Sequence, residues 1–519
     1  MLVPAEHDLA EPHLRQVLMS AGLDVEYVRA EGDILYERGT GGAERPVLDL
    51  VGGYGSLLFG HNHPEIVTHA KALLDAQTPV LAQFSVQSIA SEVAAALNGI
   101  MQRELGTDEP FYAIFASTGA EGVEAAMKHA ELDRGLRIAD ALAEIEQHID
   151  DALALFRDGG VVTDTDLTET VARIRRVNAE LAARPPLFAA LEGGFHGKLV
   201  GSLQLTHNPG VRTPFGALAA QARFVSPNRS GSLKPLVDEA ASAQLLDLVV
   251  EDGVVQTVER PFPLFCAFFL EPIQGEGGIT PLTPEFVEEI QEACAEIGCP
   301  VVVDEIQSGM GRTGAFLAGT AIGLHGDYYV IGKSLGGGIS KCAALLVRRS
   351  RYRPQFELLH SSTFAKDGFS SGIALKTLEL LEADDGRVYR RAAELGERLL
   401  TVMRAVRDDF PDVVKDVRGR GLMLGLDFHD QSGATAPSIG AASASGFFGY
   451  FLAGFLLREH AMRIFPTASA VNTLRFEPSI GLTVDQVDRL ETALRDLCTV
   501  LRDQEDGRFA PSPGSSGPA

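Results

Sequence analysis

The chain has 519 residues, 22% of them charged and 45% hydrophobic, so it is long enough for several domains around a large core. Its formal net charge of −25 argues against a nucleic-acid partner, because binding phosphates requires clustered basic side chains. The first residues show no basic stretch followed by an apolar run, and the longest apolar stretch, residues 446–457, is too short to span a bilayer, so we expect a cytoplasmic protein with no membrane contact. The five cysteines have no paired metal-ligand spacing, which favours unpaired thiols in a reducing compartment and no metal.

Six short apolar runs are typical of strands that are buried on both faces. They cover residues 111–115, 187–191, 266–270, 301–303, 328–331 and 343–347. Helical patterns separate many of these runs, as at residues 121–130 and 284–297. Uninterrupted apolar strands that alternate with helices predict an α/β domain with a mainly parallel central sheet. Such sheets place their chemistry at the carboxyl ends of the strands, where most of the unusual polar residues of this chain occur.

Two segments differ from this pattern. Between residues 138 and 181, apolar residues recur at three-and-four spacing on both sides of a Gly159-Gly160 break, which predicts a helical hairpin inserted between two strands. A hairpin that packs on the protein itself is favoured over one that docks a partner. Residues 510–519 consist of Ala, Pro, Ser and Gly with nothing to bury, which predicts a disordered end.

An acidic residue and a lysine follow two successive strand runs. Asp304 comes directly after residues 301–303, and Lys333, with glycines on both sides, follows residues 328–331. A buried acid is costly without a cationic or protonated partner, and for Asp304 taken alone a helix cap or an ion pair is the simpler interpretation. A glycine-flanked lysine close to a buried aspartate is what a pyridoxal-phosphate site requires, because the lysine forms a Schiff base and the carboxylate keeps the ring nitrogen protonated.

The segment Ser117-Thr118-Gly119-Ala120-Glu121 lies between a strand run and a helical pattern. Free N–H groups at a helix start bind phosphate, although the same residues also form an ordinary N-cap. A nucleotide-binding loop at Gly332-Lys333-Ser334 is rejected, because the first glycine that this loop needs would fall on Asp327. Together with Asp304 and Lys333, the segment predicts the phosphate cup of the same cofactor site.

From about residue 48 to residue 483, apart from the helical insertion, the chain resembles the class III pyridoxal-phosphate aminotransferases, a group that includes ornithine, acetylornithine, 4-aminobutyrate and diamine aminotransferases. Its motifs follow the order of the family: Gly60-His61-Asn62-His63-Pro64, residues 117–121, Phe195-His196-Gly197-Lys198, Glu271-Pro272-Ile273-Gln274-Gly275-Glu276, Asp304-Glu305-Ile306-Gln307-Ser308-Gly309, Gly311-Arg312-Thr313-Gly314, Lys333 with its glycines, His360-Ser361-Ser362-Thr363-Phe364 and Leu474-Arg475-Phe476.

The resemblance implies pyridoxal 5'-phosphate as the cofactor and fold type I. In this fold a large α/β domain with a mainly parallel sheet is joined by a smaller α+β domain made of both chain ends. The implied small domain covers residues 1–80 and 369–505. The implied large domain covers residues 81–368 with an insertion at about 132–184, and residues 506–519 remain as a disordered tail.

The resemblance also implies roles for single residues. Lys333 and Asp304 are the implied catalytic residues, Lys333 as the Schiff-base lysine and proton-transferring base and Asp304 as the partner of the ring nitrogen. Gln307 is implied to contact the phenolic oxygen of the cofactor and Phe195 to stack on its ring. The other implied cofactor-binding residues are Thr118, Gly119, Ala120, His196, Glu271, Ser362 and Thr363. Thr363 is implied to reach the phosphate of a neighbouring subunit, which makes the active unit a homodimer. Without the family, a core aromatic at Phe195 and solvated loop residues at Gln307 and Thr363 are the simpler interpretations.

Four residues are implied on the substrate side. Arg475 matches the arginine that grips the carboxylate of glutamate or 2-oxoglutarate, and Glu276 matches the glutamate that neutralises it when an amine without that carboxylate is bound. A structural salt bridge is the alternative for this pair. Tyr54 stands where ornithine aminotransferases carry a tyrosine, and Lys198 where diamine enzymes carry a lysine. These residues favour transfer of an amino group between an amine or ω-amino acid, diamine- or ornithine-like, and a 2-oxo acid such as 2-oxoglutarate.

The chain also departs from the family. Ala365-Lys366-Asp367-Gly368 replace the usual two glycines, Asn and Pro after Thr363-Phe364, so we expect this loop to take a different path. Two other functions stay open. One is a racemase, aminomutase or decarboxylase with the same cofactor, and the other is a catalytically idle scaffold protein whose helical hairpin docks a partner.

Overall fold

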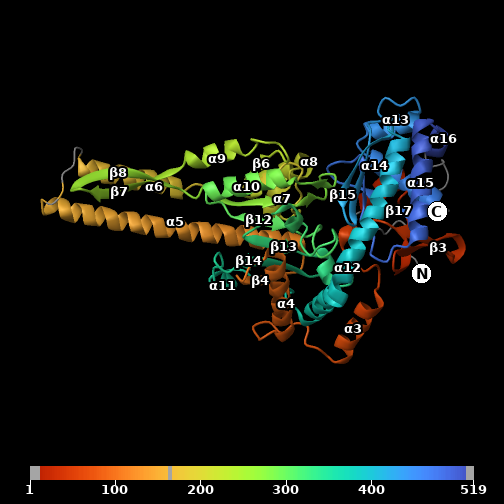
Figure 1. Ribbon diagram of the computed structural model, residues 1–519, viewed down its shortest axis with the longest axis horizontal. Helices are drawn as coiled ribbons and strands as arrows, with labels where there is room; N and C mark the ends of the chain where they lie inside the picture. Colours follow the sequence, from red (N-terminus) through yellow and green to blue (C-terminus); the bar gives the residue numbers. More distant parts are fainter. Residues whose placement is uncertain (1–11, 160, 162–165, 510–519) are drawn as a thin grey trace.

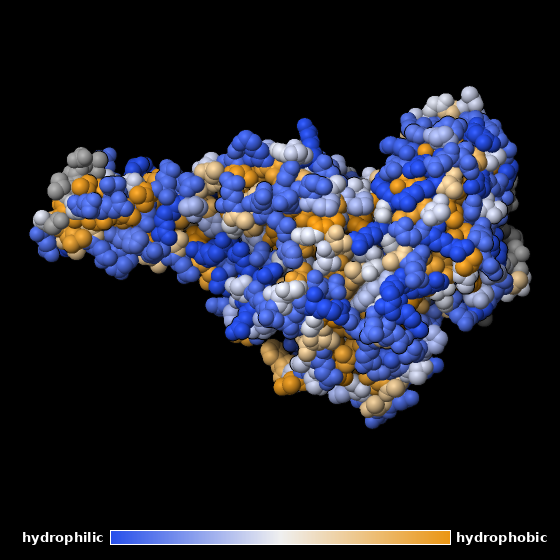
Figure 2. Space-filling view, viewed as in Figure 1, coloured by the Kyte–Doolittle hydropathy of each residue, from blue (hydrophilic) through white to orange (hydrophobic). Residues whose placement is uncertain are grey.

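The computed structural model describes residues 12–159, 161 and 166–509 (Figure 1). Figure 1 shows a central α/β body, a second unit that holds both marked chain ends, and a long arm that projects from the opposite side of the body. Most of the surface in view is hydrophilic (Figure 2). In the part of the chain that is described, no helix is long and apolar enough to cross a membrane.

The central body is built on a sheet of seven strands in the order β4-β14-β13-β12-β9-β5-β6. The strands are β4 (Phe111–Ala116), β5 (Leu187–Leu191), β6 (Ala222–Val225), β9 (Phe265–Leu270), β12 (Val301–Asp304), β13 (Tyr328–Ile331) and β14 (Ala343–Arg348). Only β14 runs antiparallel to its neighbours. The six predicted strands are therefore confirmed, together with the mainly parallel sheet. The additional strand β6 is a short edge strand that is only partly buried, so it shows no continuous apolar run.

Both faces of this sheet are covered. Alternate residues of one strand face opposite sides, as Val302 faces α5 (Gly119–Arg157) while Val303 faces α4 (Ser88–Leu105) and α10 (Pro284–Glu296). The two resulting hydrophobic clusters explain why these strands are apolar throughout. The predicted helices at 121–130 and 284–297 are the start of α5 and the whole of α10.

The smaller domain combines both ends of the chain, as predicted. Its first sheet has the order β1-β2-β3-β17, with β1 (Tyr27–Glu31), β2 (Ile34–Arg38) and β3 (Glu44–Asp49) from the beginning and β17 (Met462–Arg463) from near the end. Its second sheet has the order β15-β16-β19-β18, with β15 (Val414–Arg420), β16 (Met423–Phe428), β18 (Phe465–Pro466) and β19 (Thr473–Phe476). The helices that accompany these sheets are α12 (Gly368–Asp409), α13 (Pro437–Ala444), α14 (Phe448–His460) and α15 (Val484–Arg502).

Short elements connect these layers. They are α1 (Pro12–Ser20), α2 (Gly52–Gly55), α3 (Pro64–Asp75), α7 (Val200–Leu205), α8 (Pro209–Arg212), α9 (Lys234–Ala241), α11 (Phe356–Leu359), α16 (Asp506–Phe509), β10 (Ile273–Gln274), β11 (Thr280–Pro281) and the 3-10 turns η2 (Thr40–Gly42), η3 (Thr213–Leu218), η4 (Gly319–Ile322) and η5 (Lys333–Gly336). Helix α12 is interrupted at residues 383–386, where the backbone leaves the helical conformation between the large and small domains.

The arm consists of the second half of α5, α6 (Leu167–Ala182) and a hairpin of β7 (Gln244–Glu251) and β8 (Val254–Pro261) (Figure 1). The predicted helical pair is present, but its first helix is a continuation of α5 because the intervening residues include no proline. Both helices pack on β7, so the insertion packs on the protein itself. The prediction missed the hairpin, although Asp252-Gly253 in left-handed conformation between two strands is the usual two-residue hairpin turn.

The prediction of a disordered tail from residue 506 is wrong for its first residues. Residues 506–509 form α16, in which Phe509 is fully buried and packs against Phe448 and Phe451. The aspartate at 506 also accepts hydrogen bonds from the backbone N–H and the hydroxyl of Ser438. One large aromatic side chain is therefore enough to anchor this turn. Residues 510–519, for which the same prediction was made, lie outside the described residues.

Candidate active site

Two neighbouring strands of the central sheet carry Asp304 and Lys333 at their carboxyl ends. Asp304 is the last residue of β12 and lies opposite Val330 of β13, and Lys333 follows β13 at the start of η5. Lys333 has a φ of 45°, a left-handed conformation that is strained for a residue with a side chain. The sheet therefore places the carboxylate and the amine at one edge, as their positions after successive strand runs predicted.

The N-terminus of α5 lies beside this edge. A Cβ atom added to Gly332 would be 3.7 Å from Cα of Gly119, so the loop before Lys333 touches the first residue of the helix. Thr118 caps α5 by accepting a hydrogen bond from the N–H of Glu121, and the Glu121 carboxylate accepts one from the N–H of Ser117. The first N–H groups of a long helix attract a phosphate. Gly119 allows no side chain, since a Cβ there would meet Ile306 at 2.6 Å.

Asp304 is held by a buried histidine. The Nδ1 atom of His196 lies 2.8 Å from Oδ2 of Asp304, and the N–H of Ile306 donates to the other carboxylate oxygen at 3.1 Å. Burial lowers the pKa of His196, but the hydrogen bond to Asp304 and its negative charge outweigh this, so the pKa is raised. The Nε2 atom of His196 is buried without a hydrogen-bond partner in the described part of the chain. These two hydrogen bonds fix the orientation of the Asp304 carboxylate.

Glu271 is hydrogen-bonded to the loop that carries Phe195 and His196. Its two carboxylate oxygens accept hydrogen bonds from the N–H groups of Phe195 and Gly275, at 2.9 and 3.0 Å. Burial raises the pKa of Glu271 to about 7, against the opposing effect of His196. Phe195 itself is partly buried. Glu271 thus shapes the loop that carries Phe195 and His196, and it acts through that loop.

The charges around Lys333 come from both domains. Burial lowers the pKa of the Lys333 ammonium, which favours the neutral amine that a Schiff base requires. The negative charges of Glu477 and Glu276 oppose this effect, and Asp304 does so more weakly.

Arg475 and Glu276 form a buried two-point ion pair. The Nη1 atom of Arg475 lies 2.7 Å from Oε1 of Glu276, and Nη2 contacts Oε2. Arg475 also donates to the carbonyl of Pro466, and Glu276 accepts from the N–H of Ala468. Burial raises the pKa of Glu276, but the adjacent guanidinium outweighs this and the pKa is lowered. Both groups are therefore charged.

Tyr54 lies over this pair. The guanidinium carbon of Arg475 is 5.0 Å from the centre of the Tyr54 ring, within the range of a cation–π contact. Tyr54 has a φ of 56° in the turn of α2, and 43% of its surface is exposed. This strained turn directs an aromatic ring from the beginning of the chain onto an arginine near its end.

Gln307 follows Asp304 on the same loop and lies over Gly275. A Cβ atom on Gly275 would come within 1.7 Å of Oε1 of Gln307, so a larger residue there would displace the Gln307 amide. The Nε2 atom of Gln307 donates to Oε2 of Glu477 at 3.1 Å.

Three predicted residues lie apart from this group. Lys198 is exposed on the loop before α7, and no ion pair or hydrogen bond of its side chain is present among the described residues. Ser362 and Thr363 lie on the surface loop between α11 and α12, where the carbonyl of Thr363 accepts a hydrogen bond from Gln83. In the same loop Lys366 adopts a φ of 55°. This left-handed conformation costs a lysine more free energy than it would cost the glycines that the family usually has in this loop.

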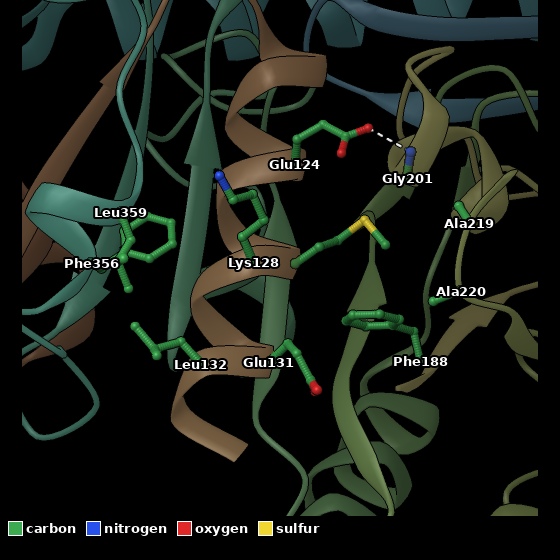
Figure 3. Close-up of a pocket in the computed structure, with 11 residues that line it drawn as sticks. Glu124, Lys128, Glu131, Leu132, Phe188, Gly201, Ala219, Ala220, Phe356 and Leu359 are labelled. Atoms are coloured by element: carbon green, nitrogen blue, oxygen red, sulfur yellow. Dashed lines mark hydrogen bonds between the residues drawn. The ribbon is translucent and has the colours of Figure 1, made fainter. Parts of the chain in front are cut away.

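A separate pocket of about 320 Å³ opens on the outer side of α5 and contains none of the predicted site residues (Figure 3). Its wall is largely apolar, with Met127, Leu132, Phe188, Phe356 and Leu359 among the lining residues. The carboxylate of Glu124 accepts from the N–H groups of Gly201 and Ser202 at 2.7 and 2.8 Å, so it caps α7 and is not directed at a ligand.

Comparisons with known proteins agree with this geometry. The family model for class III aminotransferases matches residues 19–467. The ornithine aminotransferase of Toxoplasma gondii is 20% identical over 92% of this chain and 91% of its own, with a TM-score of 0.66. The ω-transaminase of Pseudomonas jessenii in complex with PMP is 19% identical over 96% and 97%, with a TM-score of 0.70. A transaminase from the marine bacterium Virgibacillus is 18% identical over 96% and 98%, with a TM-score of 0.69.

The chain belongs to the class III aminotransferases. It is therefore a pyridoxal-phosphate-dependent transaminase of fold type I. The family match ends at residue 467, so it covers Tyr54, Lys198 and Glu276 but not Arg475, whose place in the site depends on geometry alone.

The residues of this class III aminotransferase fit the cofactor. A primary amine, a carboxylate bonded to a histidine, and a helix N-terminus converge at one edge of the sheet. The two glycines at 119 and 275 let the side chains of Ile306 and Gln307, from the loop after Asp304, pack closely beside this edge. The unpartnered Nε2 atom of His196 shows that the buried polar set is incomplete without a further group.

Two buried residues of this region, Glu477 and Arg312, were given no role of their own in the sequence analysis. Arg312 appeared only as part of a family motif, and Glu477 directly follows the motif that ends at Phe476. A signal was available, because Arg475 and Glu477 are two residues apart at the end of an apolar strand and therefore lie on the same side. Both are fully buried, which for charged residues requires partners.

Proposed function

We propose that this enzyme moves an amino group between an amine or ω-amino acid and a 2-oxo acid such as 2-oxoglutarate, in two half-reactions. The observation that supports this proposal is the buried pair of Arg475 and Glu276. A transaminase has to accept two unlike substrates in one site. A guanidinium covered by a movable carboxylate serves both, since it is neutralised for an amine and exposed for a carboxylate.

The free energy of the ion pair bears on how Arg475 changes between binding Glu276 and binding a substrate carboxylate. Breaking a buried ion pair without replacement leaves an uncompensated charge and costs several kcal/mol. A substrate carboxylate that takes the place of Glu276 on Arg475 restores the two-point contact, so little free energy is lost. An amine without that carboxylate leaves the Glu276 contact in place. The 2-oxo acid is thus recognised by displacement of Glu276.

Within the site, we assign Lys333 and Asp304 to the chemistry. Bound pyridoxal phosphate supplies an electron sink that stabilises negative charge on the substrate carbon. The Nζ atom of Lys333 anchors the cofactor and carries a proton to and from the reacting carbon. Asp304, fixed by His196, holds the proton of the ring nitrogen. The N–H groups of Gly119 and Ala120 at the start of α5, with the Thr118 cap, bind the phosphate.

For the donor, we propose an ω-amine, either a diamine or an ornithine-like amino acid. Tyr54 lies over Arg475, whereas Lys198 is exposed on a loop apart from this group and offers only a single ammonium, where a specific carboxylate clamp would need an arginine. A donor without a firmly held α-carboxylate fits these two residues.

We also propose a homodimer in which Thr363 approaches the phosphate site of the neighbouring subunit. Two surface segments are joined by hydrogen bonds from Gly368 to Val80 and from Gln83 to Thr363, at 3.0 and 2.8 Å. They carry an apolar surface patch of Val80, Leu81, Phe84, Val86, Leu358, Leu359 and Phe364. Phe84 is completely exposed and Leu358 is 91% exposed, which is costly for a surface that stays in water. A second copy that covers this patch removes the cost.

A cytoplasmic location is our proposal for the compartment. All five cysteines are free and buried, which fits the reducing interior of a cell.

The test is a substrate panel that measures glutamate formation by the purified holoenzyme. Diamines, ornithine-like amino acids and plain amines are incubated one by one with 2-oxoglutarate. We expect one glutamate per donor consumed for at least one ω-amine, and no product with Lys333→Ala. The matched control is Lys341→Ala, an exposed lysine eight positions along the chain, which should keep its activity.

The alternatives give other products in the same panel. A racemase or aminomutase changes the donor without forming glutamate, and a decarboxylase releases carbon dioxide. A scaffold protein converts none of the donors. Each of these results would contradict the proposed reaction.

A further inference from the structure

Glu477 is a fully buried carboxylate that the proposed reaction does not use. It follows β19, and none of its surface is exposed. Its Oε2 atom accepts a hydrogen bond from Nε2 of Gln307 at 3.1 Å. Its Oε1 atom is buried and has no hydrogen-bond partner among the described residues. A buried carboxylate with a free oxygen is costly, so its place in the site needs an explanation.

The Oε1 atom of Glu477 points into the space between the two domains. A Cβ atom on Gly55 would lie 3.1 Å from this oxygen, 3.5 Å from Nε of Arg312 and 3.5 Å from Cγ of Gln307. The backbone carbonyl of Gly55 also accepts a hydrogen bond from the hydroxyl of Ser334, the residue after Lys333. The carboxylate thus lies where the beginning of the chain, the end of the chain and the Lys333 turn meet.

Arg312 does not engage Glu477 directly. Its Nη1 atom donates to the carbonyls of Leu422 and Pro478, and its Nη2 atom donates to the carbonyl of Gly55. Within the described residues, no hydrogen bond or ion pair joins the guanidinium to Glu477. Backbone carbonyls therefore orient Arg312. Burial lowers the pKa of Arg312, and the negative charge of Glu477 opposes this effect without a hydrogen bond between the two side chains.

The other carboxylates near Lys333 are already committed. Both oxygens of Glu276 are bonded to Arg475, and both oxygens of Asp304 are bonded, to His196 and to the N–H of Ile306. Among the negative charges that face Lys333, Glu477 has the largest effect on its amine. It is the carboxylate of this set with an unused oxygen.

We propose that Glu477 is a positioning residue of the active site, whose carboxylate orients the Gln307 amide and provides the standing counter-charge of the Lys333 amine. The inference rests on the proposed role of Lys333 as the cofactor-anchoring residue. Glu477 holds a proton at Lys333 to higher pH than burial alone allows. It also fixes the amide that lies on the same loop as Asp304.

Three substitutions separate charge from position. Glu477→Gln removes the charge but keeps an oxygen that accepts from Gln307. Glu477→Asp keeps the charge on a shorter side chain, and Glu477→Ala removes both. The matched control is Asp33→Asn, because Asp33 is buried and accepts hydrogen bonds from the N–H and hydroxyl of Ser479, two residues from Glu477, without facing Lys333.

The measurement is the visible absorption spectrum of each holoenzyme as a function of pH, which reports the protonation of the linkage between Lys333 and the cofactor. We expect the midpoint to fall by about one pH unit or more in Glu477→Gln and in Glu477→Ala, since an opposite charge is lost. Glu477→Asp should restore most of this shift, and Asp33→Asn should leave the midpoint unchanged.

Two results would overturn the inference. One is an unchanged midpoint in Glu477→Gln, and the other is an equal shift in Asp33→Asn, which would indicate a merely structural effect on this segment. Borohydride reduction of the wild-type holoenzyme followed by peptide mass spectrometry is run in parallel. A cofactor attached to a lysine other than Lys333 would contradict the proposed function itself, and this outcome is distinct from a failure of the Glu477 variants.

Discussion

Two charged side chains of this protein face each other, largely buried, across the domain boundary. These are Arg475 and Glu276, which satisfy each other at two points. Changing Arg475 is therefore expected to weaken the binding of the substrate carboxylate that takes the place of Glu276.

Arg475→Lys is therefore expected to lower kcat/KM for 2-oxoglutarate about 10²-fold, equivalent to ~3 kcal/mol, because a single ammonium cannot make the two-point contact. The amine half-reaction, in which Glu276 stays in place, should change by only a few-fold. Stopped-flow measurement of each half-reaction separates the two effects. Arg420→Lys, an exposed arginine at the end of β15, is the control. An equal loss in both half-reactions would contradict the assigned role.

Glu305 provides a test of burial alone. Its carboxyl accepts hydrogen bonds from the hydroxyl of Ser308 and the N–H of Gly319, and burial raises its pKa to about 7. In the unfolded chain a glutamate releases its proton near pH ~4.3. The folded protein therefore loses stability as the pH rises from ~4.3 to ~7, because the folded carboxyl still holds a proton that the unfolded one has released.

Glu305→Gln should not show this loss. The free energy of unfolding of the variant, relative to wild type, is expected to rise across this interval by up to ~3 kcal/mol and to level off at higher pH. Urea unfolding at a series of pH values measures the difference. A difference that stays constant from pH ~5 to ~8 would show that Glu305 titrates at its ordinary value.

At the level of elements, the arm is held together by contacts of α5 and α6 with the β7–β8 hairpin. Asn178 of α6 is buried and bonds both backbone groups of Leu246 in β7, at 2.8 Å each. His148 of α5 and Arg260 of β8 converge on Asp247, each at 3.1 Å. The apolar side chains of Leu155, Phe156 and Val254 are exposed near the free end, where Figure 2 shows hydrophobic surface.

Asn178→Ala is expected to loosen the arm and to leave catalysis intact. The substitution removes the side-chain amide that bonds the N–H and the carbonyl of Leu246, and water cannot easily reach these partly buried groups. We expect the loss to lower the free energy of unfolding of the arm by about 1–3 kcal/mol. Hydrogen exchange followed by mass spectrometry should show faster exchange in β7 and β8 and unchanged exchange in β12 and β13. Turnover with the best donor should stay within about two-fold of wild type. A large loss of turnover would instead link the arm to the active site.

The sequence predicts six of the seven strands of the sheet because each of the six is a continuous apolar run, whereas β6 is not. It predicts Asp304 and Lys333 as neighbours because Asp304 ends one strand and Lys333 follows the next. The β7–β8 hairpin escaped prediction because its second strand is largely exposed and polar. Contacts between distant segments, such as Tyr54 over Arg475 within the smaller domain and Gln307 with Glu477 between the two domains, depend on tertiary packing. Local spacing does not encode that packing, so these contacts required the structure.

At the scale of the whole molecule, the apolar surface patch on residues 80–86 and 358–364 predicts self-association. The native mass of the enzyme should be twice the 55.4 kDa of one chain. Replacing Phe84 and Val86 by Asp should yield monomers and reduce turnover, because Thr363 then lacks the neighbouring site. Size-exclusion chromatography with light scattering measures the mass. Val254→Asp on the arm is the control, and a monomeric wild-type enzyme would refute the proposed dimer.

Our central proposal is that the enzyme moves nitrogen from one substrate to another through Lys333. The most direct measurement uses an ω-amine with isotope-labelled nitrogen, incubated with holoenzyme in the absence of a 2-oxo acid and then, after removal of the donor, with 2-oxoglutarate. We predict labelled glutamate in an amount of one per active site, and none with Lys333→Ala. Label that is released as ammonium, or that remains on the donor, would contradict transamination.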